Sequence, residues 1–247
     1  PIFSELLKEL KDIDGTKAVV TISGCSGSGK TTLAAILSFY LNHMGLGTYV
    51  LSGDNYPHRI PMDNDAERTR LFEEGGTEAL KGYLGTEEEL GFCEVSEVIR
   101  KFKEGANVIS LRRLGREPGS LSYEDVNFEN ISVLIIEWTH GGSKFLKGAD
   151  IPVLICSTPA QTLPLRMARA RDPEPDSPFM EIVLGIEQQL IMDAAPEAKI
   201  LISHEGNIIK YEDLAKDPAG NVSPESGEEV STGLSKEQNS APEEEKC

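Results

Sequence analysis

Residues 24–32 read GCSGSGKTT, and this stretch decides the fold. It matches the pattern G-x-x-x-x-G-K-[ST] of a phosphate-binding loop, which counts only where it joins a strand to a helix. Both neighbours are predicted: residues 18–22 are a β-branched apolar run typical of a buried strand, and residues 33–44 are apolar over a length that suits a helix. The flanking pattern disfavours the alternative, an ordinary Gly/Ser turn followed by Lys-Thr.

Each residue type in this loop has a physical task. Glycines let the backbone turn its N–H groups toward a phosphate, and the following helix adds the partial positive charge of its N-terminus. Lys30 is expected to reach the β- and γ-phosphates, and the hydroxyl of Thr31 to hold Mg²⁺. The predicted nucleotide-binding residues of the loop are Gly24, Ser26, Gly27, Ser28, Gly29, Lys30, Thr31 and Thr32.

Length and charge limit the class of protein. The 247 residues are 39% apolar, enough for a buried core, and the net charge is −17. Such an acidic chain disfavours nucleic acid and anionic membrane as partners, because both attract basic surfaces. The sequence has no apolar run of membrane-spanning length and begins without signal-peptide features, so a cytoplasmic location is expected. The cysteines lack metal-binding spacing and are expected to be reduced thiols: Cys25, Cys93, Cys156 and Cys247.

An acidic residue follows the second predicted strand. Residues 48–52 form this strand, and Asp54 comes two residues later. Ligands of open parallel sheets bind outside the carboxyl ends of the strands, so Asp54 is expected at the same edge as the phosphate loop. There a carboxylate can take a proton from an acceptor hydroxyl and contact Mg²⁺. The alternative is a solvated turn residue.

A second carboxylate ends a later strand. Residues 131–136 are almost entirely apolar, and Glu137 follows them. A carboxylate at the ligand edge suits a Mg²⁺ ion that retains several waters. Alone this signal is weak, but it gains weight beside Asp54 and the phosphate loop.

Together these segments resemble the uridine kinase and phosphoribulokinase family of P-loop kinases. The motif D-x-[FY] is matched by SGDNYPHR at Asp54 and Tyr56, and residues 99–108, IRKFKEGANV, are similar to the family's L-K-x-G-x-x-V segment. The resemblance implies an α/β P-loop NTPase fold, a mostly parallel sheet with helices on both faces. It also implies an ATP-dependent kinase that uses Mg²⁺ and transfers the γ-phosphate to an alcohol, with Asp54 as catalytic base and Glu137 as the second acidic site.

Residues 163–172, LPLRMARARD, are similar to the family's lid helix, which carries arginines over the nucleotide phosphates. Guanidinium groups in that place stabilise the spread charge of a transferring phosphoryl group. A solvated basic helix end is the alternative, and residues 173–178 depart from the family by lacking its second arginine-glycine step. The resemblance assigns Arg169 a catalytic role, Arg166 and Arg171 a role in nucleotide binding, and Asp172 a place in the lid.

The acceptor is the least determined part. Residues 110–126 do not match the segment that accompanies nucleoside specificity, but they contribute arginines, and His58-Arg59 is similar to a phosphoribulokinase pattern. Arginine suits carboxylates and phosphates, so an anionic acceptor, a sugar phosphate or a hydroxy acid, is favoured. Surface ion pairs are the alternative for any one arginine, and packing is the alternative for the last two residues listed. The predicted acceptor residues are Tyr56, His58, Arg59, Arg112, Arg113, Arg116, Trp138 and His140.

The chain is predicted to form one kinase domain, residues 1–215, with a tail at residues 216–247. The tail holds eight acidic and three basic side chains and no aromatic residue, a composition typical of disorder. The expected partner is a small-molecule acceptor, and a homodimer is left open. Two alternatives remain: a uridine or cytidine kinase, and an NTPase switch or energy module that acts on a protein partner.

Overall fold

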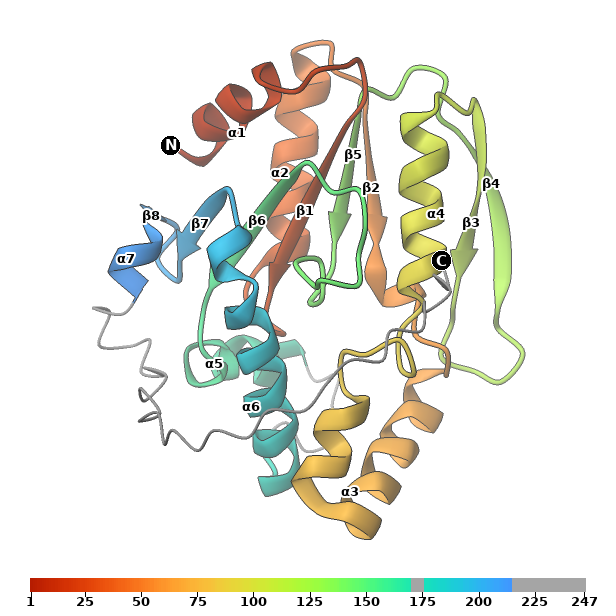
Figure 1. The fold of residues 1–247 in the computed structure, drawn as a ribbon, viewed down its shortest axis with the longest axis vertical. Coiled ribbons are helices and arrows are strands. Elements are labelled where there is room, and N and C mark those ends of the chain that lie inside the picture. Colours follow the sequence, from red (N-terminus) through yellow and green to blue (C-terminus); the bar gives the residue numbers. More distant parts are fainter. Residues whose placement is uncertain (170–175, 215–247) are drawn as a thin grey trace, which may run out of the picture.

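The computed structural model describes residues 1–169 and 176–214. A six-stranded sheet with the strand order β2-β5-β1-β6-β7-β8 forms its centre, and every pair is parallel except the last. The strand that leads into the phosphate loop is central, with neighbours on both sides (Figure 1). The strands are β1 (Ala18–Gly24), β2 (Thr48–Ser52), β5 (Val133–Glu137), β6 (Ile151–Cys156), β7 (Ile200–Ser203) and β8 (Ile208–Ile209).

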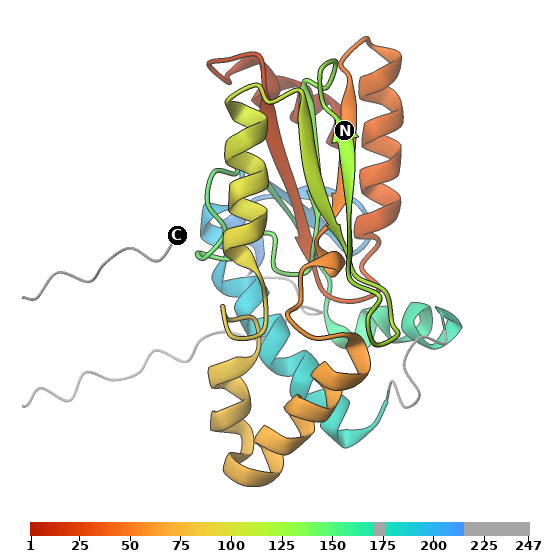
Figure 2. The ribbon, with the colours of Figure 1, turned by 90° about the vertical axis from the view of Figure 1, so that its right-hand side faces the viewer.

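Helices cover both faces of the sheet. α1 (Ile2–Lys11) and α2 (Lys30–His43) lie on one face, and α4 (Phe92–Lys103) and α6 (Pro178–Asp193) lie on the other. Figure 2 shows α2 and α4 on opposite sides of the strands. The predicted α/β architecture is therefore confirmed.

The core follows the two-residue period of the strands. In β1, Val19 faces the α4 side and Val20 faces the α2 side. In β5, Leu134 and Ile135 divide between the two sides in the same way. Because both faces are covered by helices, these strands are apolar at consecutive positions, which is the pattern that predicted buried parallel strands.

A separate antiparallel hairpin flanks α4. Its strands β3 (Val108–Arg113) and β4 (Ser122–Asn127) pair along their full length. The residues between them form a loop, and the backbone N–H of Leu114 donates to Asn55 Oδ1 at 3.1 Å. The hairpin loop is thus tied to the turn that carries Asp54.

The lower end of the molecule in Figure 1 is a helical lobe beyond the carboxyl edge of the sheet. It consists of α3 (Pro61–Tyr83), which kinks at Gly76 (φ 65°), and the first part of α6. A small apolar core of its own joins the two helices: Leu80, Leu84, Val183 and Ile186. The remaining elements are η1 (Gly53–Asn55), α5 (Pro159–Arg169), η2 (Ala195–Glu197) and α7 (Tyr211–Leu214).

The structure adds detail at the last strand and at the cysteines. β8 ends at Ile209, and Tyr211 begins a helical turn, where Glu212 and Asp213 favour a helix start. Cys25 and Cys156 are free thiols, as predicted.

The part of the chain that the structure describes contains no helix long and apolar enough to cross a membrane. The predicted tail at residues 216–247 lies outside the described residues, as do Cys247, Arg171 and Asp172. The division into a kinase domain and a tail therefore remains a prediction.

Candidate active site

The phosphate loop leaves β1 and enters α2 through three glycines with positive φ: Gly24 (147°), Gly27 (82°) and Gly29 (94°). A Cβ at Gly24 would lie 2.9 Å from the carbonyl oxygen of Ile155, and one at Gly27 would lie 3.0 Å from Cγ of Arg166. Conformation and space both require glycine here, because L side chains rarely adopt these angles.

The Lys30 side chain lies inside the curl of the loop. Its Nζ donates to the carbonyl oxygens of Gly24 at 2.9 Å and Cys25 at 3.0 Å. Burial lowers the pKa of Lys30, and the negative charge of Asp54 is the strongest influence that raises it. A cation held by carbonyl oxygens at a helix N-terminus is suited to the anionic end of a nucleotide.

Glu137, the last residue of β5, links β2 to the start of α2 at the carboxyl edge. Its Oε2 accepts from Thr31 Oγ1 at 2.9 Å, and its Oε1 accepts from Ser52 Oγ at 2.6 Å. Ser52 pairs with Glu137 in the β2-β5 register. The carboxylate is only 7% exposed. An all-oxygen cluster of this kind fits Mg²⁺, which prefers oxygen ligands and retains much of its water. Ser52 was not predicted as a site residue.

Replacing Glu137 with glutamine should raise the Mg²⁺ concentration that gives half-maximal activity by about tenfold, because a carboxylate of the metal shell loses its charge. Activity measured against Mg²⁺ concentration checks this, with the exposed Glu129→Gln as the control. Coinciding titrations of Glu137→Gln and the wild type would exclude Glu137 as a metal residue.

Asp54 is exposed in η1, directly after β2. The turn is held from below, because a Cβ at Gly53 would lie 2.0 Å from Cγ of Trp138, and from the side by the Asn55 contact with the hairpin loop. Its carboxylate also influences Lys30. The structure thus brings Asp54 and Lys30 to the same edge of the sheet.

Three predicted acceptor residues are buried instead. Tyr56 is 1% exposed in the apolar core under α4, and Trp138 is 2% exposed and packs on Phe92 with ring centroids 4.8 Å apart. His140 is 8% exposed. Tyr56 and Trp138 belong to the core, whereas His140 also lines a pocket beside α6, and the acceptor roles predicted for these side chains remain predictions.

The predicted arginines are mostly engaged within the protein. Arg112 is buried and donates to Glu94 Oε1 at 2.9 Å and to the carbonyl oxygen of Pro57 at 2.8 Å. Arg113 donates to Tyr49 Oη at 2.8 Å and pairs with Glu124 at 2.9 Å. Both guanidinium groups hold the hairpin in place, and their predicted contact with an acceptor remains a prediction.

The other predicted acceptor residues lie nearer the surface. Arg59 donates to Tyr83 Oη at 3.0 Å, with its guanidinium over that ring, and lies 3.9 Å from Glu67. His58 is exposed and lies 3.0 Å from the carbonyl oxygen of Glu87. Arg116 is exposed in the hairpin loop. The predicted arginine cluster is therefore spread over three different environments.

Of the predicted lid arginines, the structure describes Arg166 and Arg169. Arg166 of α5 is buried against Gly27 of the phosphate loop and donates to the carbonyl oxygen of Pro159 at 3.1 Å. Arg169 is exposed at the end of the helix. The aliphatic part of the Arg166 side chain lies beside Gly27, and the roles of Arg166 in nucleotide binding and of Arg169 in catalysis remain predictions.

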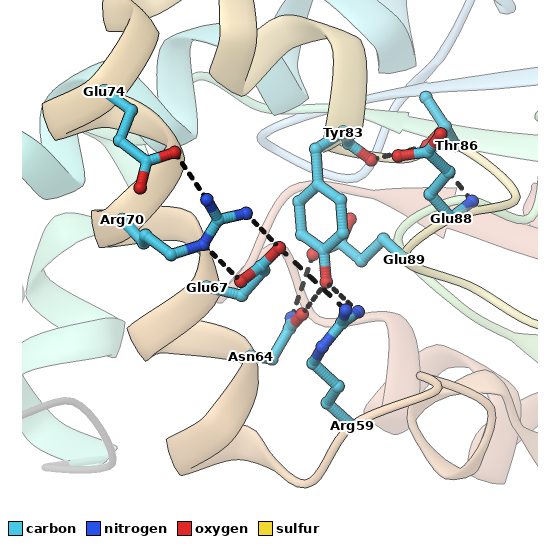
Figure 3. Close-up of polar contacts among 9 residues, drawn as sticks. All are labelled: Arg59, Asn64, Glu67, Arg70, Glu74, Tyr83, Thr86, Glu88 and Glu89. Carbon is cyan, nitrogen blue, oxygen red and sulfur yellow. Dashed lines mark hydrogen bonds and ion pairs between the residues drawn. The ribbon is translucent and has the colours of Figure 1, made fainter.

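A buried polar network between α3 and α6 was not predicted from the sequence. Glu89, with no exposed surface, accepts from Asn64, from Arg68 at 2.6 Å and from the N–H of Gly85 at 2.7 Å. Figure 3 shows its continuation from Asn64 through Tyr83 to Arg59. On α6, Glu187 lies 3.6 Å from Arg68. The sequence does indicate that Glu187 is unusual, because it lies four residues from both of the buried residues Val183 and Ile191, at a helix position where an apolar residue is expected.

Because His140 is buried, we expect the free energy of unfolding to fall as the pH is lowered. Burial lowers its pKa to about 4, with Glu89 opposing and Arg68 and Lys30 assisting. In the unfolded chain a histidine titrates near 6.5, so below that pH the unfolded chain binds the proton first and folding weakens. At about pH 5 we expect a loss of roughly 2 kcal/mol from this residue.

Urea unfolding of the wild type and of His140→Gln at neutral pH and at about pH 5 measures this loss. The wild type should lose more stability than the variant between the two conditions. Equal losses would mean that His140 is not held neutral in the folded protein.

Comparison with known proteins adds relatives of three kinds. The family model described as adenylylsulphate kinase matches residues 16–70. A bifunctional alpha-galactosidase/sucrose kinase from Mediterraneibacter gnavus is 45% identical over 192 residues, which are 78% of this chain and 20% of that protein. Among solved structures, phosphoribulokinase from Rhodobacter spheroides has a TM-score of 0.58 at 16% identity, covering 76% of this chain and 70% of that one. D-glycerate 3-kinase from Cryptococcus neoformans has a TM-score of 0.52 at 14% identity, covering 85% and 95%.

These similarities differ in how much of each protein they cover and in sequence identity. The chain spans a fifth of the length of the sucrose kinase relative, and the family model covers the segment from β1 into α3. The structural matches have low sequence identity and concern the fold. With its loop, its central β1 and its acidic carboxyl edge, the chain has the fold of the P-loop kinases, including phosphoribulokinase.

Proposed function

We propose that the chain is an ATP-dependent kinase that transfers the γ-phosphoryl group to an alcohol of a small molecule. The observation that carries this is the cluster of Thr31, Glu137 and Ser52 beside Lys30 and the exposed Asp54. Phosphoryl transfer needs a phosphate clamp, a magnesium site and a residue that orients the nucleophile, and these side chains are suited to all three tasks.

The proposed roles follow from the chemistry of each group. Lys30 and the loop N–H groups bind the β- and γ-phosphates, while Thr31 and Glu137 hold Mg²⁺, which neutralises phosphate charge. Asp54 accepts the proton of the acceptor hydroxyl while the hydroxyl oxygen bonds to the γ-phosphorus and ADP leaves. Arg166 adds positive charge to the nucleotide side of the loop.

We infer that the acceptor is a neutral sugar rather than an anion. The case for an anion depended on free arginines, and Arg112, Arg113 and Arg59 are engaged by partners inside the protein. The relative named as a sucrose kinase is 45% identical over most of this chain. An anionic acceptor is the second candidate, favoured by the exposed Arg116.

The last part of the proposal concerns the cofactors, the partners and the location of the protein. ATP and Mg²⁺ are the proposed cofactors, and the net charge of −17 disfavours nucleic acid and anionic membranes as partners. We propose a cytoplasmic protein and leave open whether it forms a homodimer.

A panel of acceptors tests the proposal. Purified protein is incubated with ATP and Mg²⁺ and either sucrose, glucose or fructose, a sugar phosphate, D-glycerate, or uridine, and the products are identified by mass spectrometry. We expect a neutral sugar to be phosphorylated well above the anions and uridine. Turnover confined to an anion would replace the proposed acceptor, and slow ATP hydrolysis that ignores every acceptor would favour an NTPase switch.

A further inference from the structure

Glu187 is a buried carboxylate whose surroundings differ from those of its neighbour Glu89. Glu89 accepts four hydrogen bonds, two of them from Arg68, and is a satisfied part of the scaffold. Glu187 is 9% exposed, and its ion pair with Arg68 is 3.6 Å long, beyond a normal hydrogen bond. Arg68 therefore binds Glu89 closely, and it lies at longer distances from Glu187 (3.6 Å) and from Asp65 (3.7 Å).

The pKa directions of the two carboxyls agree with this geometry. Burial raises the pKa of Glu187, and Arg68 only partly opposes it. At Glu89 burial also acts to raise the pKa, but Arg68, the Gly85 N–H and Asn64 together hold it below its usual value. Environments that separate two neighbouring carboxyls in this way are typical of functional sites.

α6 brings Glu187 near the phosphate loop and Asp54. α6 packs on α3, on α5 and on β1, the strand that ends in the phosphate loop. The charges of Lys30 and Asp54 both act on the Glu187 carboxyl. Its helix neighbour Ile186 belongs to the lobe core, which fixes the helix in that orientation.

We propose that Glu187 and Arg68 form the subsite that binds the non-reacting hydroxyls of a neutral polyol acceptor, an inference that rests on the proposed kinase function. The two oxygens of Glu187 can accept hydrogen bonds from adjacent hydroxyls, and Arg68 can donate to a third oxygen of the same molecule. An anionic acceptor would meet the negative charges of Glu187 and Asp54. The pair thus selects a hydroxyl-rich, uncharged substrate.

A purely structural role predicts different behaviour. A buried charge that only supports the fold is well paired, and losing it destabilises the protein, as expected for Glu89→Gln. A buried charge that is retained for function opposes folding, so its neutral replacement preserves or increases stability. Because the pKa of Glu187 is raised, its ionised form costs stability at neutral pH.

The test compares Glu187→Gln with Glu181→Gln, an exposed glutamate on the same helix, and with Glu89→Gln. For the neutral sugar that the wild type phosphorylates best, Glu187→Gln should raise the KM by roughly 10-fold to 100-fold, the loss of charge-assisted hydrogen bonds. The KM for ATP should stay within about threefold of the wild-type value, and the Tm should be equal or higher. Glu181→Gln should resemble the wild type, and Glu89→Gln should have a lower Tm.

Each other outcome overturns the inference in a recognisable way. An unchanged sugar KM in Glu187→Gln leaves the kinase function standing and removes the subsite. A raised KM for ATP would mean that Glu187 acts on ATP binding through Lys30. A Tm as low as that of Glu89→Gln would mean that Glu187 stabilises the folded protein. If the wild type phosphorylates only anions or no acceptor at all, the proposed acceptor and the subsite both fail.

Discussion

Replacement of Lys30 by alanine is expected to lower phosphoryl transfer by about 10³-fold or more while the protein stays folded. The Nζ lies within the loop on the carbonyl oxygens of Gly24 and Cys25, at the N-terminus of α2. Removing it deletes the cation expected on the β- and γ-phosphates. The loop keeps its glycines and the backbone bond from Ser28 N–H to the carbonyl oxygen of Cys25 when this side chain is removed.

The measurement is the single-turnover rate at saturating ATP, with thermal unfolding of the same sample to verify folding. Lys11→Ala, an exposed lysine on α1, is the control and should resemble the wild type. A folded Lys30→Ala protein with wild-type turnover would remove the phosphate-loop assignment.

Asp54→Asn is expected to reduce the rate by about 10²–10⁴-fold, the range for losing a positioned base. Nucleotide affinity should change only a few-fold, because Asp54 is exposed in η1 and its proposed task is to take the proton of the acceptor hydroxyl. Asparagine keeps the shape of the side chain and its turn preference, so the change isolates the negative charge.

ADP binding by calorimetry separates the two effects of this substitution, because Asp54 also raises the pKa of Lys30. A large loss of ADP affinity would mean that Asp54 acts mainly through Lys30. Retention of full rate would exclude the acceptor-base role. The exposed Asp14→Asn is the control.

Local pattern was enough to predict the strand and the helix on either side of the phosphate loop. The phosphate loop is contiguous, and its flanking strand and helix have distinct apolar periods, so β1 and α2 were recognised from their own residues. Asp54 and Glu137 were found because parallel strands put their carboxyl ends at one edge. Their closeness to Lys30 and Thr31 follows from the order of β2, β5 and β1 in the sheet.

The acceptor side depends on contacts that no local pattern contains. Arg112 meets Glu94 from another element and Pro57 from a distant turn, so its sequence neighbours gave no sign of burial. Tyr56 is one residue beyond η1, where a small rotation of the turn decides between core and site. Glu187 and Arg68 come together only when α3 and α6 form the lobe.

The independent core of the α3–α6 lobe has a consequence for how such an enzyme can change. Leu80, Leu84, Val183 and Ile186 hold the lobe together without the residues of the phosphate loop. If the lobe binds the acceptor as proposed, mutations on its inner surface will alter which alcohol is accepted while the fold of the phosphate loop is kept. A directed-evolution library restricted to the inner faces of α3 and α6 is the economical route to a kinase for a new sugar.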